Sequence, residues 1–269
     1  MYALDFEYDG QKLSDKKFII CDFNSPSGAD TISAGSKISF NTVSRHSGKR
    51  FGLSSTNYEE CFECKFHICK HPDMNDDMEI STGECRNLVR WLNRREFLPF
   101  KFIFDNDDVT DRIFDASFNI SRIEINKKLY GLELEMHTNR PFAYSELYGV
   151  NLNFEDISAE GIVIDGSDEI GYIYPDMKIE CLEDGDLEVR NKTIECIMVI
   201  KNCKAGEIIQ IQGDAMIITS SESEHAIYDD FNYRFLRIGN TMETRENIIT
   251  ANLPCKIQMR YRALFKGVF

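Results

Sequence analysis

The chain has 269 residues, of which 42% are hydrophobic and 12% aromatic, enough apolar material for one large core or two ordinary ones. No run approaches the roughly 18 apolar residues of a membrane helix, and the acidic start does not resemble a secretion signal. We therefore expect a soluble product, made in a cytoplasm. The formal net charge of −14 opposes tight, specific binding to nucleic acid, because phosphate recognition needs clustered Lys and Arg.

The charge is divided unevenly along the chain. Residues 1–142 contain 23 acidic and 19 basic residues, a net of −4, whereas residues 143–269 contain 22 and 12, a net of −10. This difference favours two domains with a boundary near residue 142. Nine cysteines form an odd set in a chain without an export signal, so we expect reduced thiols.

The first half alternates between apolar and polar residues as short antiparallel strands do. Tyr2–Tyr8 alternates in this way and ends at an Asp9-Gly10 turn, which indicates a hairpin. The further predicted strands of this half are Phe18–Phe23, Lys37–Val43, Tyr58–Lys70, Phe100–Phe104, Ile113–Ile125 and Tyr130–Thr138. Turn-forming residues separate them, including a turn at 46–49.

One helix is predicted over about residues 81–95. Ser81 and Glu84 have the spacing of a capping box. The predicted buried stripe consists of Cys85, Leu88, Val89 and Leu92, and Trp91 widens it. Pro99 opposes continuation of the helix.

The second half contains no convincing helix. Its predicted strands are Val150–Phe154, Gly161–Ile164, Met177–Cys181, Leu187–Arg190, Thr193–Lys201, Ile208–Gln212, Ala215–Ile218, Phe235–Ile238, Asn247–Ala251 and Lys256–Leu264. Many short strands at this spacing, separated by turn signals, are typical of a β-sandwich.

A cluster of zinc-binding residue types occurs in the first half, at Cys61, Cys64, His67, Cys69 and His71, with Cys85 downstream. The cluster lies in a segment of period two without glycine, where neighbouring positions face opposite ways. Ordinary strand cysteines are therefore the favoured interpretation, and zinc binding is the alternative.

Other chemical signals point to turns. The acidic stretches 105–111 and 183–186 read as hairpin turns and lack the register of a calcium loop. Ser47-Gly48-Lys49 lacks the preceding glycine of a phosphate-binding loop, and the five histidines occur in no recognisable triad order. We predict that the protein is not an enzyme and assign no catalytic, cofactor-binding or metal-binding residue.

Several segments resemble the distal tail protein family of long-tailed bacteriophages. They are F-x-Y-D-G at Phe6–Gly10, FIICDF at Phe18–Phe23, the capped helix ending Leu88-Val89-Arg90-Trp91-Leu92, the FxF strands at Phe100–Phe104, Leu129–Leu134, and Asn139-Arg140-Pro141-Phe142. The match spans roughly residues 1–142. Gly171–Met177, Ile200–Cys203 and Gly206-Glu207 are similar to the family's C-terminal part.

The resemblance implies a structural subunit of the hub that joins the tail tube to the tail tip or baseplate of a phage or prophage. It implies a ring, usually a homohexamer, formed by an N-terminal β-barrel-like domain with one helix (1–142). It also implies a C-terminal galectin-like or carbohydrate-module-like β-sandwich (143–269). The expected partners are further copies of the chain, the tail tube protein, a tail-tip protein and, as a further option, receptor-binding proteins, with no membrane. The expected location is the virion tail.

Two alternative functions remain open. The first is a carbohydrate-binding or receptor-binding accessory module of a tail. It is suggested by aromatic residues of the type that sugar-binding sites use for stacking, namely Tyr172, Tyr174, Tyr228, Phe231 and Tyr233. Core packing is the competing role for these side chains. A tail-tip hydrolase is disfavoured because the motifs are missing. If the chain forms a ring, we expect acidic side chains in the lumen, where they would repel the DNA backbone.

Overall fold

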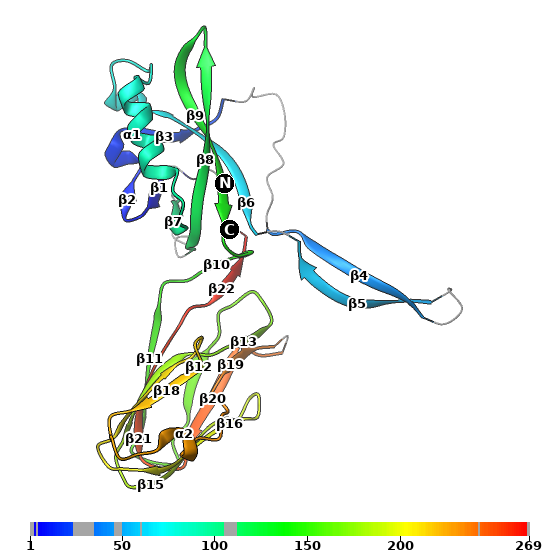
Figure 1. The fold of residues 1–269 in the computed structure, drawn as a ribbon, viewed down its shortest axis with the longest axis vertical. Helices are drawn as coiled ribbons and strands as arrows, with labels where there is room; N and C mark the ends of the chain where they lie inside the picture. Colours follow the sequence, from blue (N-terminus) through cyan, green and yellow to red (C-terminus); the bar gives the residue numbers. More distant parts are fainter. Residues whose placement is uncertain are drawn as a thin grey trace. The chain divides into compact units, whose positions relative to one another are not determined.

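The computed structural model describes residues 3, 5–23, 35–45, 50–59, 61–104, 112–241 and 243–267. The chain divides into two compact units: unit 1 comprises residues 1–145 and 265–269, and unit 2 comprises residues 146–264. Strands dominate both units, which confirms the predicted mainly β fold (Figure 1). The end of the chain belongs to unit 1, so the backbone leaves this unit and returns to it.

Unit 1 is built on an antiparallel sheet in the order β2-β1-β7-β8-β9-β6-β3. Its strands are β1 (Asp5–Tyr8), β2 (Gln11–Lys12), β3 (Phe18–Cys21), β6 (Glu63–Lys70), β7 (Leu98–Ile103), β8 (Phe114–Ile125) and β9 (Lys128–Thr138). Two further pairings lie outside this sheet: β10 (Phe142–Tyr144) with β22 (Leu264–Lys266), and β4 (Ile38–Arg45) with β5 (Arg50–Tyr58). Unit 1 also contains two 3-10 turns, η1 (Ser14–Lys16) and η2 (Pro72–Met74).

The seven-stranded sheet is strongly curled. Phe6 on β1 and Phe66 on β6 lie four strand positions apart, which is roughly 19 Å in a flat sheet. Their ring centroids are nevertheless 5.8 Å apart, edge to face. In the described part of the chain the edge strands β2 and β3 do not pair with each other, so the curled sheet is an open barrel.

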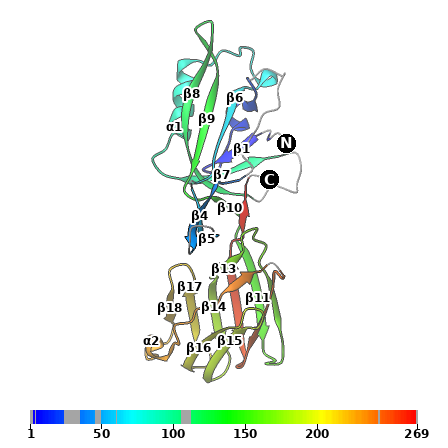
Figure 2. The same ribbon diagram turned by 90° about the vertical axis from the view of Figure 1, so that its right-hand side faces the viewer.

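Helix α1 (Thr82–Leu92) lies against the sheet at β8 (Figure 2). The predicted capping box is confirmed. The Glu84 N–H donates to Ser81 Oγ at 3.2 Å, and the Ser81 N–H donates to Glu84 Oε2 at 2.8 Å. Glu84 also forms an ion pair with the buried Lys70 ammonium at 3.0 Å, which ties the start of the helix to β6.

Two details of the helix prediction are wrong. The helix ends at Leu92 rather than near residue 95, because Asn93 leaves the helical conformation and its side-chain amide donates to the Phe118 carbonyl at 2.7 Å. Val89, predicted in the buried stripe, is 38% exposed, whereas Trp91, predicted to widen the stripe, is buried. Trp91 Nε1 donates to the Tyr8 carbonyl at 3.2 Å, an interaction that valine cannot make.

Unit 2 is a β-sandwich of two antiparallel sheets (Figure 1). One sheet contains β11 (Tyr148–Phe154), β21 (Cys255–Tyr261), β14 (Asp176–Cys181), β17 (Ile208–Gln212) and β18 (Ile217–Ser220). The other contains β12 (Gly161–Ile164), β20 (Glu246–Ala251), β15 (Gly185–Asn191) and β16 (Cys196–Cys203). A separate pair joins β13 (Gly171–Ile173) to β19 (Ile238–Asn240). The core side chains alternate along these strands, as in β21, where every second residue is buried.

Some strands predicted for unit 2 have the observed bounds, and others are shifted along the chain. The predicted bounds of β12 and β17 agree with the structure, whereas the strand predicted at Phe235–Ile238 occurs as β19, two to three residues later. The expectation of no helix in this half is wrong. A short helix of one turn, α2, spans Ile227–Asp230.

In unit 1 the strand predicted at Tyr58–Lys70 is two strands. β5 ends at Tyr58 and β6 begins at Glu63, with Phe62 buried between them. Among the described residues, neither helix of the chain is long and apolar enough to cross a membrane.

Candidate functional site

The β4–β5 hairpin has several large apolar side chains that are exposed to solvent. Within the described residues its two strands pair only with each other, and four of its apolar side chains are 41–65% exposed. These residues are Ile38, Phe40, Val43 and Leu53. A two-stranded hairpin in water has marginal stability by itself, so this element gains most from packing against another surface.

Three of the four apolar residues lie on the same face of the hairpin. Phe40 pairs with Thr56, and Thr42 pairs with Leu53, because β5 carries one extra residue between them. Without this bulge, Leu53 would point to the opposite face. The face formed by Ile38, Phe40 and Leu53 is called the hairpin face below, and Val43 lies on the other side.

The base of the hairpin is attached to unit 1. The Tyr58 ring packs edge to face on Phe142, with centroids 4.8 Å apart, and the Ser36 hydroxyl donates to the Pro141 carbonyl at 2.8 Å. Lys37 and Glu59 close the base with an ion pair at 2.5 Å. The hairpin is therefore attached to unit 1 at its base, whereas the described side chains along its strands are largely exposed to solvent.

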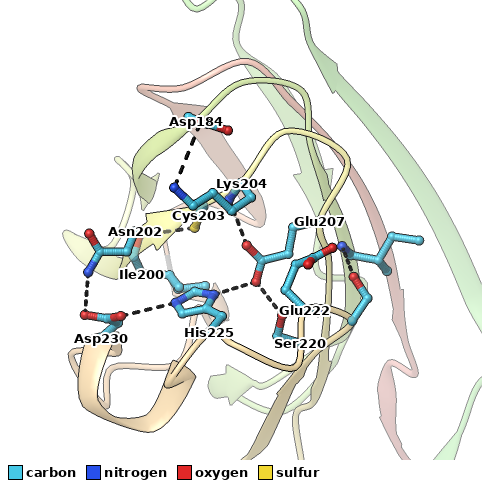
Figure 3. A network of polar contacts seen from close by, with 12 residues as sticks. Asp184, Ile200, Asn202, Cys203, Lys204, Glu207, Ser220, Glu222, His225 and Asp230 are labelled. Atoms are coloured by element: carbon cyan, nitrogen blue, oxygen red, sulfur yellow. Dashed lines mark hydrogen bonds and ion pairs between the residues drawn. The ribbon is translucent and has the colours of Figure 1, made fainter.

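A buried polar network lies in unit 2 (Figure 3). Its centre is Glu207, whose side chain is fully buried. The carboxylate accepts hydrogen bonds from the Ser220 hydroxyl, from His225 Nδ1 at 2.6 Å and from the Lys204 backbone N–H at 2.9 Å. On the other side of the imidazole, Nε2 lies 3.4 Å from an Asp230 oxygen, close enough for an ion pair but without the geometry of a hydrogen bond.

The network stabilises both charges of its central pair. Burial alone would raise the pKa of Glu207, but the hydrogen bonds from Ser220, His225 and the Lys204 N–H together lower it below its ordinary value. Burial alone would lower the pKa of His225, but the hydrogen bond and charge of Glu207, with smaller contributions from Cys203 and Asp230, raise it. A carboxylate–imidazolium pair is therefore favoured inside the unit.

This arrangement is unsuited to nucleophilic catalysis. In a Ser-His-acid triad the imidazole lies between the hydroxyl and the carboxylate, so that it can accept the proton of the nucleophile. Here the carboxylate of Glu207 lies between Ser220 and His225. The network connects α2, through Asp230, to the hairpin of β17 and β18, and its geometry is that of a structural clamp.

The cysteines and histidines considered for zinc binding do not converge. Cys61 is exposed ahead of β6, whereas Cys64 faces inward, and burial raises the pKa of its thiol to about 12. His67 pairs across the sheet with Glu133 at 3.4 Å, and His71 accepts from the Asp73 N–H at the start of η2. Among the described residues, no group of three or more Cys, His, Asp or Glu residues is arranged to hold a metal.

The cysteines are described along the whole chain, and all nine are free. Two buried thiols, Cys85 on α1 and Cys255 on β21, belong to the two hydrophobic cores.

The acidic stretches have different outcomes. Residues 105–111 and the 46–49 turn lie outside the described residues. In the second stretch Asp184 accepts from the Ala205 N–H at 2.8 Å, and Asp186 accepts from the Asn202 N–H at 3.0 Å. These carboxylates cap turns, which agrees with the turn interpretation.

The aromatic residues of unit 2 fall into two groups. Phe231 is buried in the core, as expected for a packing role, but Tyr172, Tyr228 and Tyr233 are 53–67% exposed. Tyr174 and Tyr233 line the same surface cavity. Sequence reasoning named these aromatic residues but missed the network around Glu207 and the hairpin face.

Comparison with known proteins identifies both halves of the chain. Residues 1–140 match the family model described as a phage tail protein N-terminal domain, and residues 142–261 match the model described as a phage tail C-terminal domain. The SPbeta prophage-derived uncharacterized protein YomH of Bacillus subtilis (strain 168) is 24% identical over 187 residues, covering 66% of this chain and 68% of that protein.

A solved structure shares the fold over nearly the whole chain. It is the SPP1 Dit (gp 19.1) protein, described as a paradigm of the hub adsorption apparatus in phages that infect Gram-positive hosts. The match has a TM-score of 0.66 at 11% identity and covers 97% of this chain and 99% of that one. The two family matches together span nearly the whole of both units, and the chain belongs to this family of phage tail proteins.

Proposed function

We propose that the chain is a structural subunit of the hub at the distal end of a phage or prophage tail, where it joins the tail tube to the tail tip. The observation that carries the proposal is the likeness to the SPP1 Dit protein, which extends over 97% of the chain and so includes both units and their order. Membership of a phage tail family and the resemblance of residues 1–142 to distal tail proteins support it. The role we propose is structural rather than catalytic.

A hub subunit of this kind acts through self-association. We propose that copies of the chain form a closed ring, a homohexamer by analogy with the family, and that the hairpin face packs on the neighbouring copy. Three exposed apolar side chains on the same side of the hairpin support this role. In a ring each copy offers the same hairpin and receives the next one, so all interfaces are equivalent.

The ring would place its two faces against different tail proteins. We propose the tail tube protein and a tail-tip protein as these partners, with receptor-binding proteins as a further option. The net charge of −14 fits a channel that lets DNA pass without binding it, because acidic side chains repel phosphate.

The oligomer is tested by mass measurement of the purified full chain, using light scattering and native mass spectrometry over a range of concentrations. We expect a ring for the wild type and a shift to monomer for the double variant Phe40→Ser, Leu53→Ser, since it removes the apolar hairpin face. Val43→Ser is the matched control, because Val43 is also exposed on the hairpin but lies on its other side.

The position in the tail is tested in particles. Electron microscopy of tails made with the double variant should show tubes without tips, whereas Val43→Ser should give complete tails. Normal tails with the double variant would contradict the role of the hairpin face. Normal tails in the complete absence of the chain would contradict the hub assignment itself.

A further inference from the structure

Unit 2 has a surface cavity of about 340 Å³ that the hub role does not use. Its walls come from the start of β16 and the turn before it, the turn before β18, the segment before β14, and the stretch between α2 and β19. The residues that matter for its chemistry are Tyr174, Glu195, Tyr233, Arg234 and Arg237. Small-molecule sites typically measure roughly 300–1,000 Å³, so the cavity suits a small ligand.

Two arginines in the cavity lack an anionic partner. Within the described residues neither Arg234 nor Arg237 forms an ion pair, although the chain carries 45 acidic residues. Arg237 Nε is buried and has no hydrogen-bond acceptor. The guanidinium lies 3.8 Å from the centroid of the Tyr172 ring, which holds it in place without neutralising it. The positive charge of this guanidinium is therefore not compensated by a protein anion, and a bound anion would pair with it.

The cavity walls are held by specific backbone contacts. A Cβ on Gly213 would lie 1.9 Å from the Tyr174 carbonyl oxygen, so only glycine lets the β17–β18 turn approach Tyr174 this closely. Glu195 and Tyr233 both have left-handed backbones, with φ of 52° and 57°. Non-glycine residues in this conformation are costly and occur where the surroundings fix them. The surroundings therefore fix the backbone at Glu195 and Tyr233.

The remaining lining groups suit a hydroxylated ring. Tyr233 is 67% exposed at the cavity rim, and exposed tyrosine rings stack on the apolar C–H faces of sugars. The Glu195 carboxylate accepts hydrogen bonds from hydroxyl groups. It also repels ligands with several negative charges, which disfavours polyphosphates.

We propose that this cavity binds an anionic sugar, whose phosphate or carboxylate group pairs with Arg237 and Arg234 and whose ring stacks on Tyr233 and Tyr174. Glu195 accepts hydrogen bonds from the sugar hydroxyls. The site lies entirely within unit 2 and does not depend on ring formation or on the hub role.

The ligand class is tested by calorimetric titration and saturation-transfer NMR on the purified full chain. The probes are glucose 6-phosphate, glucuronate, glucose, inorganic phosphate and adenosine monophosphate. We expect glucose 6-phosphate or glucuronate to bind at least roughly tenfold more tightly than glucose, since a hydrogen bond between two charged groups is stronger than one between neutral groups. Comparison of the two charged sugars distinguishes phosphate from carboxylate as the preferred anion.

Variants locate the site. Arg237→Met keeps the length of the side chain and should weaken binding of the charged sugar by roughly tenfold or more without weakening binding of glucose. Tyr233→Ala should weaken charged and neutral sugars alike. Tyr228→Ala is the matched control for Tyr233, because Tyr228 is 53% exposed in the same unit but lies outside the cavity. Arg190→Met is the matched control for Arg237→Met, because it also removes one positive charge from unit 2 but at a residue outside the cavity that pairs with Glu188.

Four results would overturn the proposal. They are no binding of any probe, equal binding of glucose and the charged sugars, inorganic phosphate binding as tightly as glucose 6-phosphate, and adenosine monophosphate binding more tightly than both charged sugars. The last result would assign the cavity to nucleotides. A loss of binding in Tyr228→Ala equal to that in Tyr233→Ala would also place the site elsewhere.

Discussion

The two units fill their cores with different side chains. Among the described residues, 10 of the 21 buried residues in the core of unit 1 are aromatic, compared with 3 of 24 in unit 2. The core of unit 1 is enclosed by one curled sheet and one helix, so its side chains must reach across a wide interior, as Phe6 and Phe66 do. Unit 2 has two sheets face to face, typically about 10 Å apart, and interdigitated aliphatic residues fill that gap.

The exposed features of the two units also differ in polarity. Unit 1 extends an apolar hairpin with Phe40 65% exposed, whereas unit 2 has a buried ionic network and a cavity lined by arginines. The unit with the aromatic core therefore offers apolar contact, which suits assembly. The unit with the aliphatic core offers polar contact, which suits recognition of a ligand. Because each unit has its own hydrophobic core, we expect that the two units can be destabilised separately.

The largest effect is expected from Leu88→Asp. Leu88 is 2% exposed in the core of unit 1, and a carboxylate at this position has no partner, so we expect a loss of about 4 kcal/mol or more. Scanning calorimetry should show that the transition of unit 1 is lost while that of unit 2 stays at its wild-type temperature.

Val89→Asp is the matched control, since it changes the next residue on the same helix to the same side chain. Val89 is 38% exposed, and we expect a change within about 0.5 kcal/mol. Equal losses for both variants would show that the helix is packed differently. A simultaneous loss of both transitions in Leu88→Asp would show that the units do not unfold separately.

The next largest effect is expected in unit 2 and should leave unit 1 unchanged. Glu207→Ala removes the acceptor of three hydrogen bonds and leaves His225 buried without its main partner, so we expect a loss of about 3 kcal/mol confined to unit 2. The measurement is the midpoint of chemical denaturation followed separately for each unit. Glu222→Ala, an exposed glutamate in the neighbouring loop, should change stability little. A Glu207→Ala protein as stable as wild type would show that the network contributes nothing.

A smaller effect follows from pH. The pKa of Glu207 is lowered on folding, so its contribution is complete above its ordinary value of 4.5 and is lost as pH falls through the lowered pKa. The pKa of His225 is raised, so its contribution is complete below 6.5 and is lost as pH rises through the raised pKa. The melting temperature of unit 2 should therefore be highest between about pH 4.5 and 6.5. Glu207→Ala should flatten this maximum, and an unchanged profile in that variant would exclude the pair as its cause.

Sequence patterns predicted those elements that have one buried and one exposed face. The alternation along β17 and the capping box of α1 both gave the observed start and end points within a few residues. The hairpin strand β5 was missed because its apolar and polar residues do not alternate, whereas β4, which is similarly exposed, has the alternation of Ile38 and Phe40 and was predicted. The helical stripe predicted the burial of Trp91, but the hydrogen bond from its ring N–H to the Tyr8 carbonyl joins residues 83 positions apart, which no local pattern could show.

The candidate sites were less predictable than the fold. Glu207 and His225 are 18 residues apart and meet only because β17 and β18 form a hairpin with a particular register. No local motif encodes this meeting. Tyr174 and Tyr233 were identified from residue type alone, but their association with two unpaired arginines requires the three-dimensional arrangement.

The smallest effect, Ser81→Ala, tests whether the start of α1 belongs to the stability of unit 1. Loss of the N-cap hydroxyl should cost about 1 kcal/mol, because the Glu84 N–H loses its acceptor. Ser81→Asp replaces the cap but places a second carboxylate beside Glu84, whose own side chain accepts from the Ser81 N–H. We therefore expect Ser81→Asp to recover only part of the loss, and only in the transition of unit 1. Full recovery would mean that the cap acts alone, without a contribution from the reciprocal bond that the Ser81 N–H donates to Glu84.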